Sequence, residues 1–144
     1  MFKKITVAYN GSPEARRALT QAIHLARTLG AELEAITVLQ DLPPYSAYAV
    51  AADGALLQTL IGDRQEQCAM LHVEARDKAS QEGVNLETHV LDGEAVDAIV
   101  RFVFHNKTDL LVIGLHRHTS HISRLWSTVY DVALEAPCSI LGVH

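Results

Sequence analysis

Five short apolar segments alternate with helical patterns along the whole chain, and few folds accommodate such an order. The segments are Lys4–Tyr9, Leu33–Leu39, Asn85–Leu91, Leu110–Ile113 and Cys138–Val143. Parallel strands cannot be joined by a tight turn, so each pair needs a crossover, which a helix normally supplies. The alternation therefore predicts a five-stranded, parallel, doubly wound α/β sheet that is flanked by helices.

The four helices predicted between these segments carry recognisable start and stop signals. The first begins at Pro13, with Ser12 as its N-cap, and ends before Gly30, a typical C-terminal stop. Its apolar residues recur at spacings of three and four, which is typical of a helix that packs one face on a sheet. The other helices are expected over Ala55–Glu82, Glu94–Asn106 and Ser127–Glu135.

Two further segments have distinctive patterns. Asn85–Leu91 alternates apolar with polar residues, as an edge strand does. The connection Gln40–Gly54 has no strand or helix period, contains Pro43-Pro44 and is long for a compact α/β domain. We expect this connection to be a lid or a less ordered segment, and the first place that a protease cuts.

Composition narrows the class of protein. The 144 residues favour a single domain over 1–144, and a net charge of −5 argues against a nucleic-acid partner. No apolar run approaches the roughly 20 residues of a membrane-spanning helix, so no membrane contact is expected. The chain enters a strand at once, without a signal-peptide pattern, and Cys68 and Cys138 lie far apart. We therefore expect a cytoplasmic protein whose two cysteines are reduced, buried thiols.

The carboxyl ends of the predicted strands mark the candidate site, because doubly wound sheets bind ligands there. The segments concerned are Ala8–Ser12, Val38–Asp41 and Gly114–Thr128. The last of them joins a strand, a polar loop and a helix start. Unpaired amides at a helix start favour phosphate or another anion, and Arg117 and Arg124 add positive charge to the loop.

Three motifs carry a family resemblance. The first strand ends in Tyr9-Asn10-Gly11-Ser12, and Ala136-Pro137-Cys138 leads into the last strand. Between them stands Gly114-x2-Arg117-x9-Ser127-Thr128. Together with the strand order, these motifs resemble the universal stress protein family over essentially the whole chain. ATP-binding members of that family carry Gly-x2-Gly-x9-Gly followed by serine or threonine.

The resemblance implies a Rossmann-like sheet of the adenine nucleotide alpha-hydrolase-like type and a homodimer paired through the last strand, Cys138–Val143. It implies ATP, or another adenine nucleotide, as the ligand. The backbone at Ala8 and Val38 would line the adenine pocket, and Asn10 would lie near the adenosine. The residues implied at the phosphates are Gly114, Arg117, Ser127 and Thr128.

The motif departs from the family at two of its three glycines. Arg117 hinders the close backbone approach that glycine permits, although its charge could serve an anion instead of lying in solvent. Ser127 is a suitable N-cap and would then pair the amides that a phosphate needs. Asn10 stands where ATP-binding relatives have an acid, so it either bonds a ligand or only forms a turn.

The sequence offers no evident catalytic or metal centre. The loop histidines His116, His118 and His121 have no cysteine or acid near them in sequence, so we expect them in solvent rather than on a metal. No Ser-His-Asp or Cys-His arrangement is legible, and ATP hydrolysis would lack an obvious general base. The protein is therefore expected not to be an enzyme.

Two functions remain open. The first is a dimeric stress-response module with a degenerate nucleotide site that binds ATP weakly or not at all. The second is a functional ATP-binding stress protein that acts as a nucleotide-dependent switch. The replacement of two glycines and the amide at Asn10 favour the first. A titration with ATP separates them.

Overall fold

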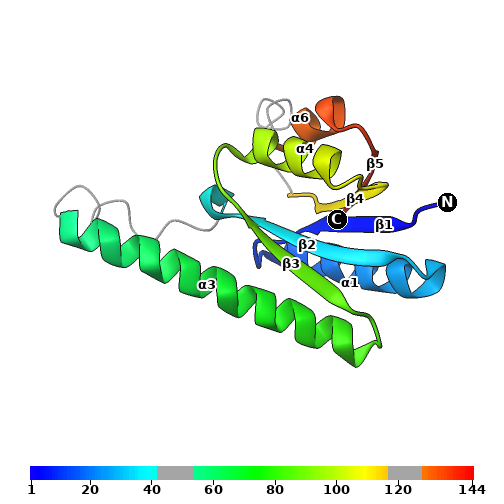
Figure 1. Ribbon diagram of the computed structural model, residues 1–144, viewed down its shortest axis with the longest axis horizontal. Helices are drawn as coiled ribbons and strands as arrows, with labels where there is room; N and C mark the ends of the chain where they lie inside the picture. Colours follow the sequence, from blue (N-terminus) through cyan, green and yellow to red (C-terminus); the bar gives the residue numbers. More distant parts are fainter. Residues whose placement is uncertain (42–53, 117–127) are drawn as a thin grey trace.

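The computed structural model describes residues 1–41, 54–116 and 128–144. In this part of the chain the sheet has five parallel strands, namely β1 (Lys4–Ala8), β2 (Glu32–Val38), β3 (Leu86–Leu91), β4 (Leu110–Gly114) and β5 (Ser139–Val143). Their order is β3-β2-β1-β4-β5, so β3 and β5 form the edges (Figure 1). The predicted doubly wound fold and the edge position of the 85–91 segment are both confirmed.

The described helices are α1 (Pro13–Leu29), α3 (Gly54–Gln81), α4 (Ala95–His105) and α6 (Thr128–Glu135), with a short 3₁₀ turn, η1 (Leu39–Asp41). The caps predicted for α1 are present. The Ser12 hydroxyl accepts a hydrogen bond from the Ala15 N–H at 3.1 Å, and Gly30 is left-handed with φ of 63°. Local sequence therefore fixes both ends of α1.

The start of α4 differs slightly from the prediction. Glu94, expected as its first residue, is the N-cap and has an extended backbone. Its carboxylate accepts hydrogen bonds from the N–H groups of Asp97 at 2.9 Å and Val96 at 3.0 Å. These two bonds lower the pKa of the Glu94 carboxyl. An acid at a helix start thus caps the helix as serine would.

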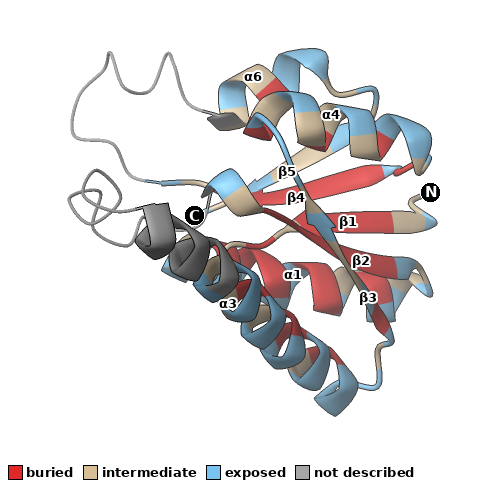
Figure 2. Cartoon of the chain, turned by 60° about the vertical axis from the view of Figure 1, so that its left-hand side comes forward, coloured by how far each residue is buried: buried red, intermediate tan, exposed pale blue. Residues whose placement is uncertain are grey.

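The sheet lies between two helical layers, with α1 and α3 on one face and α4 and α6 on the other (Figure 2). Small residues dominate the interface of α1 and α3 with the sheet, where Ala18, Ala22 and Ala75 are fully buried. Such side chains let the helices lie close on the strands. The opposite core is built from larger side chains, including Ile99 and Leu111.

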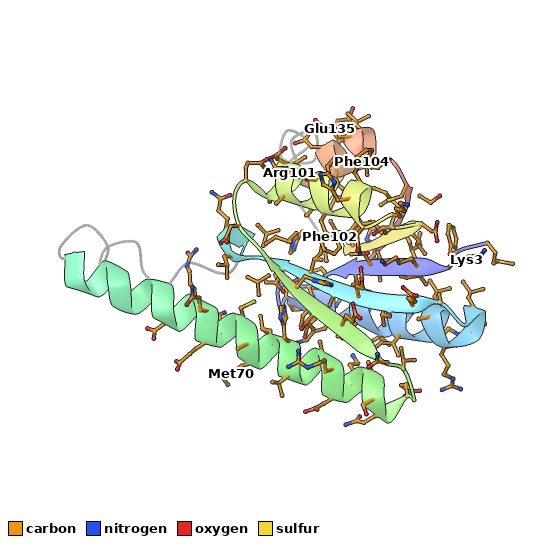
Figure 3. The ribbon with its side chains drawn as sticks, viewed as in Figure 1. Lys3, Met70, Arg101, Phe102, Phe104 and Glu135 are labelled. Atoms are coloured by element: carbon orange, nitrogen blue, oxygen red, sulfur yellow. The ribbon has the colours of Figure 1, made fainter. Side chains whose placement is uncertain are left out.

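The long helix α3 packs only one side on the sheet. Met70, on its outer side, is exposed and points away from the sheet (Figure 3). No helix in the described ranges is long and apolar enough to cross a membrane. Residues 42–53 of the predicted lid connection lie outside the described residues.

Candidate functional site

The strand order reverses between β1 and β4, at the centre of the sheet. The chain runs outward from β1 to β2 and β3, and then crosses to β4 on the other side of β1. Because β1 and β4 are parallel neighbours, Ala8 and Gly114 end them at the same edge of the sheet (Figure 2). A crevice at this position is where doubly wound proteins bind ligands.

Four of the predicted site residues come together at this edge. Ala8, Val38 and Gly114 end the adjacent strands β1, β2 and β4, and Asn10 follows β1 by two residues. Thr128 is the first residue of α6. The remaining positions, Arg117 and Ser127, lie outside the described residues, as do His118 and His121. The structure therefore describes the part of the candidate site that is formed by the ends of β1, β2 and β4.

Asn10 forms the turn between β1 and α1. Its side-chain oxygen accepts a hydrogen bond from the Ser12 N–H at 3.0 Å. Gly11 has φ of 79°, and a β-carbon there would lie 2.7 Å from the Leu71 side chain of α3. The turn role that sequence left open for Asn10 is thus present, and its side-chain oxygen points back into the turn.

The first amides of α1 are paired within the helix start itself. Ser12 takes two of them, because its hydroxyl accepts from Ala15 and its carbonyl from Arg16 at 2.9 Å. Pro13 has no N–H. The N–H of Glu14 bonds that residue's own carboxylate, and this bond is the main reason that the pKa of Glu14 is lowered. The start of α1 therefore presents a carboxylate, rather than unpaired amides, to an incoming anion.

Gly114 is required by helix packing. A β-carbon at this position would lie 2.6 Å from the carbonyl carbon of Glu14 and 2.8 Å from the nitrogen of Ala15. Both atoms belong to the backbone of α1, so they cannot move aside as a flexible side chain can. The first turn of α1 thus rests directly on the end of β4, which explains this glycine without any ligand.

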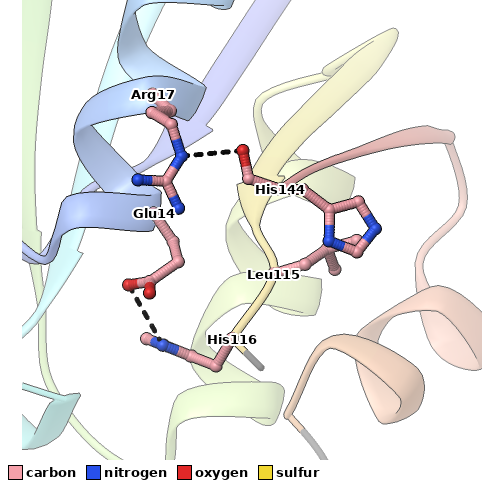
Figure 4. Close-up of a pocket in the computed structure, with 5 residues that line it drawn as sticks. All are labelled: Glu14, Arg17, Leu115, His116 and His144. Atoms are coloured by element: carbon pink, nitrogen blue, oxygen red, sulfur yellow. Dashed lines mark hydrogen bonds and ion pairs between the residues drawn. The ribbon is translucent and has the colours of Figure 1, made fainter. Parts of the chain in front are cut away.

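A depression of about 400 Å³ adjoins this contact (Figure 4). It is lined by Glu14, Arg17, Leu115, His116 and His144. The His116 Nδ1 lies 3.2 Å from a carboxylate oxygen of Glu14, and the Arg17 Nε donates to the His144 carbonyl at 2.7 Å. Sequence reasoning placed His116 in solvent and did not single out Glu14, since the two are about a hundred positions apart.

A buried polar cluster lies between β2 and α3. The Thr37 hydroxyl donates to the Tyr9 carbonyl at 2.6 Å, so it must accept from the Nε2 of His72 at 2.8 Å. The Cys68 sulfur is 3.6 Å from the same nitrogen. Burial lowers the pKa of His72 and raises that of Cys68, which keeps both groups neutral. The i,i+4 spacing on α3 was the signal for this pair that sequence reasoning missed.

The two cysteines have different environments. Cys68 is buried, as expected from the sequence, whereas Cys138 is only half-buried. Burial is the main cause that raises the pKa of each thiol. A protonated, enclosed thiol beside a neutral imidazole is a packing element rather than an activated nucleophile.

The fold and the crevice together define a doubly wound α/β protein with its candidate ligand site at the topological switch point. The model of the universal stress protein family matches residues 1–144, and the chain belongs to this family. The resemblance seen in the sequence motifs is thereby confirmed.

Relatives match over nearly their full length. A universal stress protein of Thermus aquaticus is 30% identical, with 100% of both chains covered. One of Methanocaldococcus jannaschii is 28% identical over 99% of this chain and 82% of its own. Among solved structures, a universal stress protein in complex with cAMP has a TM-score of 0.77 at 26% identity and covers 99% of this chain and 97% of its own. A family member of Arabidopsis thaliana with AMP bound shares the fold, with a TM-score of 0.71 at 17% identity, over 98% of this chain and 90% of its own.

Proposed function

We propose that this universal stress protein is a dimeric stress-response module whose adenine-nucleotide site is degenerate and binds ATP weakly or not at all. It acts as an interaction module and not as an enzyme. Two observations support this proposal. Arg117 and Ser127 replace two glycines of the nucleotide-binding motif, and the start of α1 carries a carboxylate next to the end of β4.

The main support for the proposal is that the first turn of α1 has no amide available for a phosphate among those described above. Its amides are paired internally, and the Glu14 carboxylate stands beside Gly114 and His116 at the end of β4. A triphosphate bound at this end of β4 would meet this negative charge, and like charges repel. In the motif itself, Arg117 and Ser127 replace two glycines that would permit close backbone approach.

The alternative is a functional ATP-binding protein that acts as a nucleotide-dependent switch. It is favoured by the retained Gly114 and Thr128 of the motif and by the 26% identical relative that was solved with cAMP. In this alternative Arg117 supplies charge to the phosphates in place of backbone amides.

Titration calorimetry with Mg-ATP separates the two functions. We expect a dissociation constant weaker than about 10 μM, because the amides and close contacts that hold phosphates are reduced. Submicromolar binding at moderate salt would contradict the degenerate site and support the switch. Mass spectrometry of the purified protein adds a direct check for copurified nucleotide.

Variants in the motif test the cause. Arg117→Gly combined with Ser127→Gly is expected to raise ATP affinity by roughly tenfold or more, since it restores both positions of close approach. The matched control is Arg124→Gly, which removes a loop arginine outside the motif and should not raise affinity. An equal rise in both variants would mean that loop charge or flexibility, rather than the motif glycines, governs binding.

The dimer is proposed through the outer side of β5. This strand pairs with β4 on one side and is last in the sheet order. The Ser139 N–H bonds the Asp109 carbonyl, so by strand alternation Leu141 also faces β4 while Ile140 and Gly142 turn their N–H groups outward. Two such edges around a two-fold axis pair antiparallel and continue the sheet.

Gly142 of β5 makes room for a side chain of its own protomer. A β-carbon at this position would lie 2.9 Å from the Leu115 side chain. Gly142 therefore does not itself indicate a second backbone. The proposed dimer rests on the edge position of β5, whose outer side pairs with no strand of the described residues.

Light scattering at about 50 μM is expected to give a mass near twice 15.8 kDa. Ile140→Pro removes an outward N–H and should shift the protein toward monomer, whereas Ile140→Ala keeps the N–H and controls for the lost side chain. Leu141→Pro would instead break a bond to β4 and so tests the fold. A wild-type monomer, or equal masses for the proline and alanine variants, would refute pairing through β5.

A further inference from the structure

Three potential metal ligands lie on one face of the sheet, on the neighbouring strands β2 and β3. Glu87 and His89 are two positions apart on β3, so their side chains project to the same face. Glu34 of β2 is the register partner of Glu87, which places it on that face as well. Phe102 of α4, labelled in Figure 3, packs on His89, and Asn106, the C-cap of α4, bonds Glu34. The group therefore lies between the sheet and α4.

The distances within the group suit a shared cation. The His89 Nε2 lies 3.7 Å from an oxygen of Glu34 and 3.9 Å from an oxygen of Glu87. One ligand atom of each residue can be chosen so that all three lie within 4.8 Å of one another. Two ligands on a tetrahedral zinc ion are roughly 3.4 Å apart, because each bond is about 2.0–2.2 Å long.

A second observation points into the same space. The Nε2 of His89 is buried, yet it has no hydrogen-bond partner among the described residues. Its distances to the two carboxylates exceed those of a hydrogen bond. A buried ring nitrogen directed at two carboxylates without bonding either is what a metal ligand presents before the ion arrives, whereas a settled His–Glu pair would have closed to about 2.8 Å.

The surroundings hold these ligands in place. Asn106 donates a side-chain hydrogen bond to the second oxygen of Glu34, which leaves the first oxygen directed at His89. The His89 ring packs against Phe102, with ring centroids 5.0 Å apart. Such outer contacts fix ligand orientation in metal sites. Glu34 is buried while Glu87 is exposed, so an ion could enter from the Glu87 side.

The ammonium of Lys4 would compete with a metal ion for the carboxylate of Glu34. This ammonium lies 3.6 Å from the same oxygen of Glu34 that faces His89, and 3.2 Å from the side-chain oxygen of Asn106. The ammonium balances the buried carboxylate when no ion is present. A bound divalent cation would take over that role, and Lys4 would keep its bond to Asn106.

We propose that Glu34, Glu87 and His89 form a binding site for a divalent transition-metal ion, best matched by Zn²⁺. Two carboxylates and one imidazole are a nitrogen–oxygen ligand set that Zn²⁺ accepts, and the two negative charges balance the ion. Water completes the fourth position on the exposed side. The three residues are assembled only by the pairing of β2 with β3 and by α4 above them.

The test is a calorimetric titration of the full chain with Zn²⁺ at pH 7.5. His89→Asn and Glu87→Gln, both at partly or fully exposed positions, are each expected to weaken zinc binding by more than about tenfold. The control His24→Asn removes an exposed histidine of α1 and should leave the affinity unchanged. Lys4→Met removes the competing ammonium and should strengthen binding.

A structural readout accompanies the titration. The imidazole NMR signals of His89, assigned by their loss in His89→Asn, should shift when Zn²⁺ is added. Thermal melts of the metal-free variants check that each is folded. Zinc affinity that is unchanged in His89→Asn and Glu87→Gln would place the ion elsewhere, for instance on the loop histidines, and would overturn the proposal. Absence of zinc binding by the wild type would overturn it as well.

Discussion

Replacement of Gly114 by alanine is expected to destabilise the protein by about 3 kcal/mol, at the upper end of the usual cost of overpacking. The added β-carbon would lie 2.6 Å from the backbone of Glu14 in α1, with no side chain able to give way. Either α1 lifts from β4 or the end of β4 shifts. Urea denaturation followed by circular dichroism measures the loss.

Gly83→Ala is the matched control for Gly114→Ala. Gly83 follows α3 with φ of 73°, and nothing lies within 4 Å of its missing β-carbon. Alanine there should cost only about 1 kcal/mol, from the strain of a left-handed backbone. If the Gly114 variant lost no more stability than the Gly83 variant, the close contact between α1 and β4 would be wrong.

Replacement of Thr37 by valine is expected to cost roughly 2–4 kcal/mol, because the buried Tyr9 carbonyl loses its side-chain donor and the buried His72 Nε2 keeps only the weak Cys68 sulfur as a partner. The hydroxyl of Thr37 both donates to the Tyr9 carbonyl and accepts from His72. Valine has nearly the same shape, so lost packing contributes little. The free energy of unfolding, measured in urea at pH 7.5, reports the loss.

Thr37→Ser separates the hydroxyl from the methyl group. Serine keeps both hydrogen bonds and removes one buried methyl, which should cost about 1 kcal/mol. A serine variant less stable than the valine variant would show that the site is held by packing and that the hydrogen bonds around His72 contribute little.

The crevice illustrates why a motif and its environment have to be judged together. Read as a motif, Gly114 is a phosphate-binding glycine. In the structure, the first turn of α1 also packs directly on Gly114. That turn positions the Glu14 carboxylate next to the end of β4, where a phosphate would bind. A retained glycine in this family member is therefore weak evidence for retained nucleotide binding.

Several features were predictable because their causes are local in sequence. Ser12, Pro13 and Gly30 delimit α1 through hydrogen bonds and backbone angles within a few residues. Apolar periodicity separated strands from helices, and the alternation of the two left a parallel sheet as the natural solution. The doubly wound order indicated a candidate site at the carboxyl ends of the strands, and the family resemblance then implied which residues of this site would contact a nucleotide.

The remaining features depend on which distant residues meet, and one sequence does not carry that information. Glu14 and His116 face each other only because α1 rests on β4. The register between β2 and β3 brings Glu34 beside Glu87 and His89, so a histidine and two acids that look like ordinary strand residues become a candidate metal site. Local patterns determine elements and their ends. Packing between elements decides which side chains share a site, because contacts are short-ranged and depend on the register between neighbouring strands.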